Sequence, residues 1–227
     1  MKWYIENLWN IMTRPIQFFD NMPAGTWMEA PLTFSLITGW IMAFALTFVV
    51  FINNYLPTGL SLIEGIAGKK LIITVPVLAV MGVAFFIMTV LIIGGMIIAA
   101  ILGLFFVCAA ILNFLLILLG GSGNIFDVIK ACLFSSGAIL SGILNILLMI
   151  AVKYKAMSFG NWITGERVVF YCTAVFLYGI FSIIGRKMHK VERWKAFLAA
   201  TVPLILLVLF NIVFSAKILP KMEGILS

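Results

Sequence analysis

The longest uncharged stretch of the chain constrains its fold most. Residues 71–119 contain no charged side chain, and as one helix they would be more than twice as long as the ~30 Å hydrocarbon core of a bilayer. Of the 227 residues, 64% are hydrophobic and only 10% are charged, well below the ~25% that is usual for soluble domains. The chain is therefore predicted to be an integral membrane protein.

Four further uncharged segments approach the ~20 residues that a helix needs to cross a bilayer. They are residues 32–52, 131–152, 168–185 and 196–216. Backbone N–H and C=O groups cannot remain unpaired in hydrocarbon, so these segments are predicted to be helical. The predicted fold class is all-α, a polytopic bundle of transmembrane helices.

The number of spans depends on how residues 71–119 fold. They form either one long, kinked helix or two helices joined by a turn at Gly94 and Gly95. A turn there would contain no charged residue, so a hairpin would have to be shallow, re-entrant or covered by protein. One helix would give five spans and two helices would give six, so five or six spans are predicted.

A basic cluster predicts the orientation in a cell membrane. Residues 186–195 hold five of the fifteen Lys and Arg residues, and such clusters gather on the cytoplasmic side. With five spans the amino terminus shares that side, whereas with six it lies outside. The two sides carry nearly equal numbers of basic residues in either topology, so charge does not decide between them.

The first 31 residues are predicted to form an interfacial segment, and residues 32–227 one transmembrane domain. Polar residues interrupt the apolar positions of the first segment, so a cleavable signal peptide is not expected. An amphipathic helix in the headgroup region is predicted, ending at Pro15. Its apolar face has Tyr4, Leu8, Ile11 and Met12, and its polar face has Lys2, Glu6, Asn10 and Thr13.

Charged residues are predicted to lie outside the spans. All eight acidic residues, including Glu166, are assigned to loops or flanks, and His189, the single histidine, is assigned to the basic surface loop. Ion-coupled transporters and intramembrane aspartyl proteases keep ionisable groups at mid-depth in the membrane. Both classes are therefore disfavoured.

The sequence contains no recognisable metal-binding or catalytic constellation. Cys108, Cys132 and Cys172 lie in separate apolar segments, whereas zinc needs about four clustered nitrogen or sulfur ligands. We expect free cysteines that pack as small apolar side chains, no cofactor and no enzymatic activity. An enzyme acting on lipid headgroups is the least favoured alternative, because His189 and Glu192 alone are too few groups.

Small and polar residues inside the spans are candidate functional positions. Small residues let helices approach closely, and a mid-span Asn hydrogen-bonds across a helix interface. Close packing is the favoured interpretation, and a mildly polar substrate path is the alternative. These positions are Gly95, Ala99, Gly103, Asn113, Ser135, Ser136, Gly137, Ser141, Asn145 and Asn211.

The basic cluster is predicted to contact anionic phospholipids of the inner leaflet, with an acidic partner protein as the alternative. Nucleic acid is not expected as a partner, because the positive charge is spread over several loops and no soluble domain presents it. The cluster consists of Arg186, Lys187, Lys190, Arg193 and Lys195.

Several short motifs stand at defined places relative to the predicted spans. A Pro-x-x-Phe-Phe motif precedes the first span, a Gly-Gly-x-Gly-x-x-Phe turn opens the central helix, and Phe134-Ser135-Ser136 follows in that helix. The motif residues are Pro15, Phe18, Phe19, Gly120, Gly121, Gly123 and Phe126. Together with the basic connection between the last two spans, these motifs resemble the bacterial branch of the Yip1-domain family of multi-pass membrane proteins.

The resemblance implies five spans, a cytoplasmic amino terminus and a non-enzymatic role. Bacterial relatives are similar to accessory membrane subunits, some associated with ABC-type exporters, so other integral membrane proteins, ABC transporter subunits among them, are the implied partners. A central-helix proline is absent from residues 136–143, and the Asp-Leu-Tyr-Gly-Pro signature of eukaryotic members is missing, so Rab binding and Golgi trafficking are not carried over. The predicted function is an accessory or assembly subunit; the alternative is a lipid or small-hydrophobe permease or scramblase.

Overall fold

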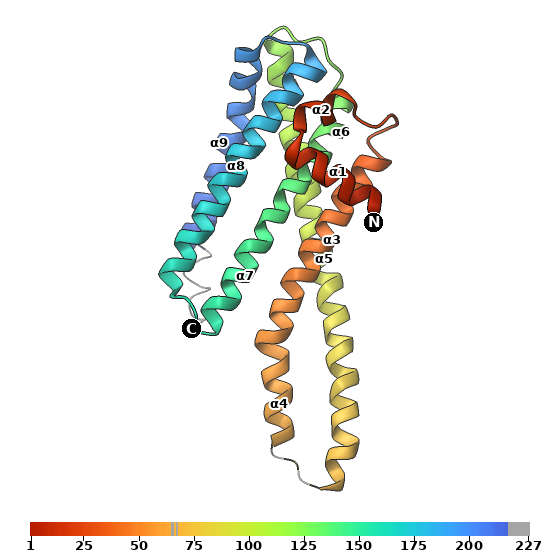
Figure 1. Cartoon of the computed structure of the whole chain (residues 1–227), viewed down its shortest axis with the longest axis vertical. Helices are drawn as coiled ribbons and strands as arrows, with labels where there is room; N and C mark the ends of the chain where they lie inside the picture. The colour runs from red at the N-terminus through yellow and green to blue at the C-terminus, as the bar shows by residue number, and fades with distance from the viewer. Residues whose placement is uncertain (65, 67, 218–227) are drawn as a thin grey trace.

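The computed structural model describes residues 1–64, 66 and 68–217, and every regular element in that part of the chain is helical (Figure 1). A π-helical turn, Phe51–Tyr55, joins α3 to α4, and a 3₁₀ segment, Ser136–Ser141, joins α6 to α7. The α-helices are α1 (Lys2–Thr13), α2 (Pro15–Asp20), α3 (Ala30–Val50), α4 (Leu56–Glu64), α5 (Lys69–Leu118), α6 (Ile125–Ser135), α7 (Gly142–Lys153), α8 (Phe159–His189) and α9 (Arg193–Lys217).

Five helical runs in the described residues are long and apolar enough to cross a membrane, which confirms the predicted all-α architecture. Four of the five runs are longer than their uncharged segments because the helix continues into the polar residues at its ends, whereas Lys70–Leu118 has the same length as its segment. The runs are Ala30–Glu64, Lys70–Leu118, Ile125–Lys153, Phe159–His189 and Arg193–Lys217.

The long apolar stretch forms one helix, α5, and not two. Gly94 and Gly95 lie inside it, and no turn interrupts the helix there. Gly94 serves packing, because a Cβ atom at this position would come within 2.6 Å of the Trp40 ring of α3. The missing side chain therefore lets an aromatic ring of α3 lie against the α5 backbone.

An antiparallel hairpin of α3–α4 and α5 extends well beyond the other helices (Figure 1). Its upper half, α3 with the second half of α5, packs against α6, α7, α8 and α9. Its lower half consists of α4 and the beginning of α5, which pack mainly against each other. We call α4 together with residues 69–88 of α5 the distal hairpin.

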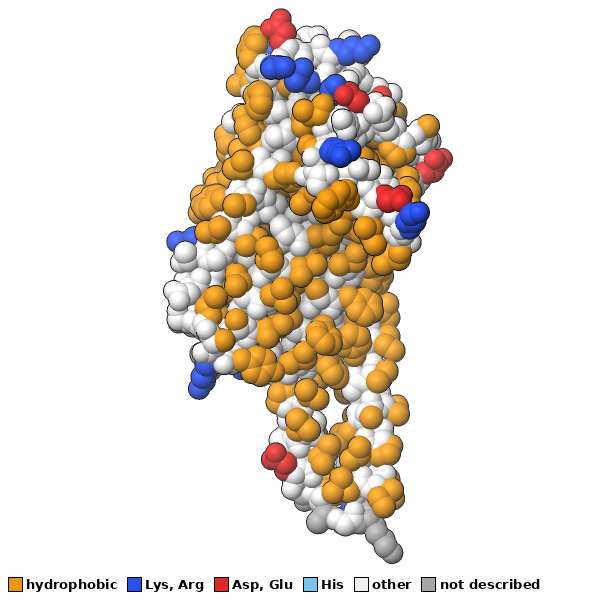
Figure 2. Space-filling model, viewed as in Figure 1, with side chains coloured by type: hydrophobic (Ala, Val, Ile, Leu, Met, Phe, Trp, Pro, Cys, Tyr) orange, Lys and Arg blue, Asp and Glu red, His pale blue; other side chains and the backbone are white. Residues whose placement is uncertain are grey.

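The amino-terminal helices lie at the same end of the bundle as the junction of α8 and α9 (Figure 1). Asp20 at the end of α2 forms an ion pair with Lys187 near the end of α8. Charged side chains gather at this end, whereas apolar side chains cover most of the visible flank (Figure 2). We call it the charged end of the molecule.

The predicted amino-terminal amphipathic helix is present as α1, and much of its apolar face packs against the rest of the protein. Tyr4 and Ile11 are buried in the core, and the Tyr4 hydroxyl lies 2.8 Å from the Thr38 hydroxyl of α3. Trp9 and Met12 remain exposed at the surface. The helix is therefore attached to α3 and also presents apolar side chains to its surroundings.

Helix α6 lies at the centre of the bundle, and its side chains from Ala131 to Ser135 are buried. The Phe134 ring meets Phe18 of α2 at a centroid distance of 5.1 Å and Phe34 of α3 at 5.5 Å. These edge and tilted contacts are the favoured geometries for aromatic pairs. The cluster joins the amino-terminal segment, the first span and the central span into one core.

Candidate functional sites

His189 is buried, and it ties three segments together at the charged end. The Gly123 backbone N–H donates a hydrogen bond to His189 Nδ1 over 3.1 Å. Nδ1 must then carry no proton, so Nε2–H is the donor toward Asn113 Oδ1 of α5, 3.0 Å away. We call His189, Asn113 and Gly123 the His189 clasp. The prediction that His189 belongs to a basic surface loop is wrong.

The glycines of the predicted Gly-Gly-x-Gly turn make room for this histidine. Gly120 has a φ of +88°, which side chains disfavour. A Cβ atom on Gly121 would come within 2.8 Å of both His189 Nδ1 and the Leu116 carbonyl oxygen. The turn connects two spans, as predicted, and Asp127 lies in the first turn of α6. Phe126, the last residue of this motif, is exposed.

Replacing Asn113 is expected to weaken the clasp. Asn113→Ala would leave the buried Nε2–H of His189 without an acceptor, at a cost of about 1–3 kcal/mol in the free energy of unfolding. SDS titration of the protein in mild detergent measures this loss. Asn10→Ala, at an exposed position of α1, is the control and should change stability by less than ~0.5 kcal/mol. Equal losses in the two variants would contradict the role assigned to Asn113.

The small-residue stripe predicted in residues 71–119 is exposed in the described part of the chain. Gly95, Ala99 and Gly103 lie at the surface of α5, and a Cβ placed on either glycine would meet no described residue of another helix within 4 Å. Close contact with α3 is made at Gly94 instead. The stripe therefore does not pack against another described helix.

The second group of small residues does pack. Ser136 accepts a hydrogen bond from Ser35 of α3 over 2.9 Å, and Ser35 also lies 2.9 Å from the Leu133 carbonyl. Ser135 is buried and bonds to the Ala131 carbonyl of its own helix. A Cβ on Gly137 would approach Leu8 of α1 to 2.7 Å. These residues form a close seam between α6, α3 and α1.

Ser141 and Asn145 line a cleft at the other half of the bundle. The cleft has a volume of about 230 Å³ and lies between α5, α7, α8 and α9. Glu166 of α8 also lines it and is only 7% exposed, and Asn211 of α9 donates to Glu166 Oε1 over 3.2 Å. We call it the Glu166 cleft. The prediction that all acidic residues lie in loops or flanks is wrong for Glu166.

The three predicted asparagines therefore occupy two separate places. Asn113 belongs to the His189 clasp at the charged end, whereas Asn145 lines the Glu166 cleft and Asn211 borders it. Among the described residues, the three asparagines therefore do not line one common cleft.

The basic cluster is mostly helical, because only residues 190–192 separate α8 from α9. Lys190 and Arg193 are exposed, whereas Arg186, Lys187 and Lys195 are partly buried. Lys187 is neutralised by Asp20. The exposed members are the ones available to a charged surface.

A buried lysine near the same end was not predicted. Lys130 of α6 is 8% exposed, and its Nζ donates to the Gly25 carbonyl oxygen over 3.2 Å. Gly25, Trp27, Phe126 and Lys130 border a cavity of about 410 Å³. The acidic residue Asp127 also lines this cavity, so residues of both charges border it.

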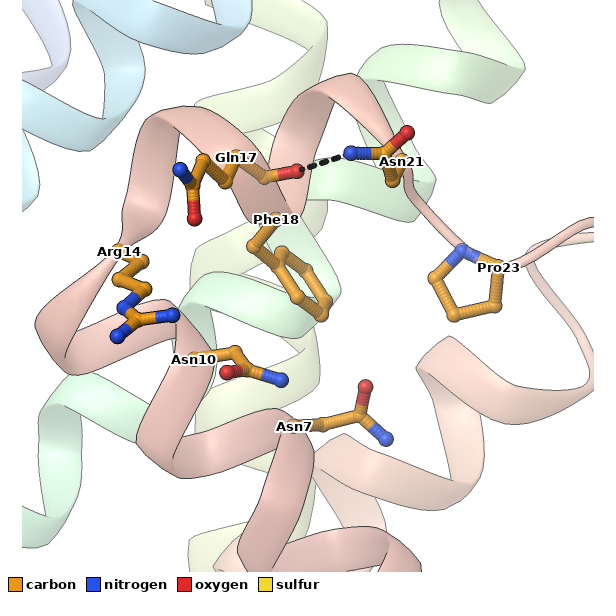
Figure 3. A pocket seen from close by; sticks show the side chains of 7 residues that line it. All are labelled: Asn7, Asn10, Arg14, Gln17, Phe18, Asn21 and Pro23. Atoms are coloured by element: carbon orange, nitrogen blue, oxygen red, sulfur yellow. Dashed lines mark hydrogen bonds between the residues drawn. The ribbon is translucent and has the colours of Figure 1, made fainter.

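A polar pocket of about 260 Å³ lies between α1 and α2 (Figure 3). The Arg14 side chain and several side-chain amides line it, and Phe18 forms part of its wall. Asn21 Nδ2 donates to the Gln17 carbonyl oxygen over 3.2 Å, which closes one side. Pro15 begins α2 as its first helical residue, and Phe18 and Phe19 turn into the core, so this motif shapes the pocket.

Cys108 and Cys132 are free and buried in the core, and Cys172 is free and exposed. Among the described residues, no three or more His, Cys, Asp or Glu side chains gather in a way that would hold a metal ion.

The burial of Glu166 was not predicted, because the uncharged segment 168–185 begins only after Glu166 and Arg167. One signal was present: Trp162, Glu166 and Thr173 fall at helical spacing with apolar Val169 and Phe170 between them. This helical period extends the predicted span 168–185 toward lower residue numbers, and it places Glu166 on the side of the helix that faces the other helices.

Comparison of the chain with models of known protein families, with curated proteins and with solved structures finds no match. The resemblance to the Yip1-domain family therefore stays a prediction.

Proposed function

We propose that this protein is a non-enzymatic integral membrane subunit that assembles with other integral membrane proteins through its distal hairpin. The observation that supports this proposal most is that the hairpin is longer than a bilayer is thick. With 50 residues, α5 is about 75 Å long at ~1.5 Å per residue. A helix tilted by about 40° crosses a ~30 Å hydrocarbon core in about 40 Å.

Roughly half of α5 then exceeds what the bilayer covers, and the excess is apolar. Large apolar side chains of the distal hairpin are exposed, and each costs free energy in water at about 25 cal/mol per Å². Apolar helices of another membrane protein would cover them. The exposed residues include Leu56, Leu60, Leu62, Ile72, Ile73, Val75, Val77, Val80, Met81, Val83, Phe85, Ile87 and Met88.

The orientation follows from the positive-inside rule as part of the same proposal. The charged end, with Lys190, Arg193 and Arg14, faces the cytoplasm and contacts anionic phospholipids. The distal hairpin then points to the opposite side. The Yip1-domain resemblance suggests an ABC-type exporter as the partner complex.

Site-specific photo-cross-linking in intact cells tests the assembly. A photoreactive residue replaces Ile73 of the distal hairpin, which is 72% exposed, and the control replaces Val175 of α8, which is 68% exposed. We expect Ile73 to capture a defined membrane protein repeatedly and Val175 to capture lipid. Capture of lipid alone at both positions would contradict the proposal.

A permease or scramblase is the second candidate function, and the Glu166 cleft is the observation that favours it. An uncoupled carrier needs polar atoms within its helices, and Ser141, Asn145 and Glu166 supply them. Reconstituted liposomes test it directly: movement of fluorescent lipid above the rate of protein-free liposomes supports transport, and an unchanged rate rejects it.

A further inference from the structure

The Glu166 cleft contains more hydrogen-bond acceptors than the described residues satisfy. Glu166 Oε1 accepts from Asn211, but within the described part of the chain Oε2 is buried without a partner, and so is Oδ1 of Asn145. Buried acceptors of this kind are few in native proteins, and each loses about 1–3 kcal/mol if it stays unpaired. The cleft therefore has room for hydrogen-bond donors that residues 1–64, 66 and 68–217 do not supply.

The two hydroxyl groups in the cleft add to the shortage of donors. Ser141 and Thr173 lie 2.6 Å apart, and each also lies 2.8 Å from a carbonyl oxygen of its own segment. Their two hydrogens cannot supply all three contacts at once. Neither hydroxyl therefore has a hydrogen left to donate to Glu166 or Asn145.

No basic side chain neutralises Glu166 within the part of the chain that the structure describes. The ion pairs there are Lys2 with Glu6 and Lys187 with Asp20, both away from the cleft. A buried carboxylate in a membrane helix is costly unless a cation accompanies it. A group that carries both positive charge and N–H donors would meet both needs of an ionised Glu166.

The remaining walls of the cleft determine what such a group can be attached to. Leu104, Phe170, Leu207 and Phe210 supply apolar surface around the acceptors. A hydrated metal ion gains no favourable contact with these apolar side chains, whereas a hydrocarbon chain packs against them. The volume of about 230 Å³ admits an amine with a short chain.

Glu166 lies near the amino-terminal end of α8, a helix long and apolar enough to cross a membrane. It is seven residues from Phe159, the start of α8, which corresponds to about 10 Å along the helix axis. The α7–α8 connection at this end is opposite the charged end (Figure 1). An amphiphile with its charged group at the interface can therefore reach the carboxylate while its chain stays in hydrocarbon.

We propose that the Glu166 cleft binds a primary ammonium group carried on hydrocarbon, with Glu166 Oε2 and Asn145 Oδ1 accepting its hydrogen bonds. Three N–H donors and one positive charge match the unpaired acceptors and the unpaired carboxylate. Two sources share this chemistry, the ethanolamine headgroup of a phospholipid and a free alkylamine. The site is independent of the distal hairpin and of the assembly proposed above.

Ligand titration of the full chain tests the proposal. The protein is placed in phosphatidylcholine nanodiscs, because choline has no N–H group, and its thermal unfolding is followed as hexylamine or hexanol is added. We expect hexylamine to raise the unfolding temperature of the wild type in a saturable manner and hexanol not to. An equal response to both compounds, a response to Na⁺ alone, or no response would overturn the proposal.

Three variants locate the binding. Glu166→Gln keeps the shape and an acceptor for Asn211 but removes the charge, so affinity for hexylamine should fall at least tenfold. Asn145→Leu keeps the carboxylate and should weaken binding severalfold, which provides a test even if the first variant does not fold. Glu64→Gln at an exposed position should bind as the wild type does. Unchanged affinity in both cleft variants would overturn the assignment.

A lipid comparison distinguishes the two sources. Nanodiscs containing phosphatidylethanolamine are dissolved in mild detergent, and the lipid retained on the protein is identified by native mass spectrometry. Retention by the wild type and not by Glu166→Gln identifies the lipid headgroup, whereas hexylamine binding without retention identifies a free amine. Either result supports the ammonium site, and neither binding nor retention would reject it.

Discussion

Replacing residues 57–81 by a four-residue Gly-Ser linker is expected to abolish assembly while the bundle stays folded. The linker would join Leu56 to Gly82, which line the same cavity between the two arms of the hairpin. Helix α4 packs mainly against the adjoining π-helical turn and α5, so the bundle loses few contacts when residues 57–81 are removed. The deletion takes away eight of the thirteen exposed apolar side chains named above for the distal hairpin, so the partner should lose most of its binding surface.

Two measurements separate these effects. The unfolding temperature in detergent should change by only a few degrees, and the partner captured from Ile73 in the wild type should no longer co-purify. Insertion of the same linker after Lys155, in the short connection between α7 and α8, is the control and should keep the partner. Assembly that survives removal of residues 57–81 would show that another surface carries it.

Phe134→Ala is expected to destabilise the bundle more than any other single truncation discussed for this chain. The fully buried ring contacts Phe18 and Phe34, and removing it leaves a cavity between three segments. Truncation of a buried Phe costs about 3–5 kcal/mol in soluble proteins. We expect about 3 kcal/mol here, because the unfolded chain in a membrane already holds the ring in an apolar medium.

Phe126→Ala is the matched control, since Phe126 belongs to the same helix and is 56% exposed. SDS titration should give a loss below ~1 kcal/mol for this variant, and Phe134→Leu should fall between the two because it leaves a smaller cavity. A Phe134→Ala protein as stable as Phe126→Ala would mean that the aromatic cluster does not hold the first and central spans together.

The architecture was predictable because the dominant constraint on this chain, the need for apolar segments of ~20 residues to cross a bilayer, appears directly in its hydropathy. Segment length, the absence of charge and the need to pair backbone groups in hydrocarbon lead to helices without any knowledge of packing. The turn at Gly120–Asn124 and the amino-terminal amphipathic helix were predictable for a similar reason, because their signals are local. Charge left the number of crossings within residues 71–119 open, and the structure has one helix there.

It was less predictable which side chains of a helix point toward the other helices and which are exposed. Gly94 contacts Trp40 whereas Gly95 is exposed, and neighbouring residues on a helix differ by about 100° in direction. Small residues follow one another on more than one stripe of α5, so composition alone does not identify the stripe that packs. Only the position of α3 decides it.

The burial of Glu166 and His189 depends on contacts that are distant in sequence. His189 is enclosed by a turn 66 residues earlier in the chain, and Asn211 lies 45 residues after Glu166. A charged or titratable residue near a helix end is normally exposed, so local sequence assigns it to the surface. The partners that bury it are visible only after the helices are assembled.

The central position of α6 has a consequence for biosynthesis. Its neighbours come from both sides of it in the chain: α3 and α5 are synthesised before it, and α8 after it. When α6 leaves the ribosome, the two earlier spans have already been synthesised, and α3 can offer it Phe34 for contact with Phe134 and Ser35 for the hydrogen bond to the Leu133 carbonyl. Insertion of α8 then closes the remaining side, so the order of translation is also the order in which the core is enclosed.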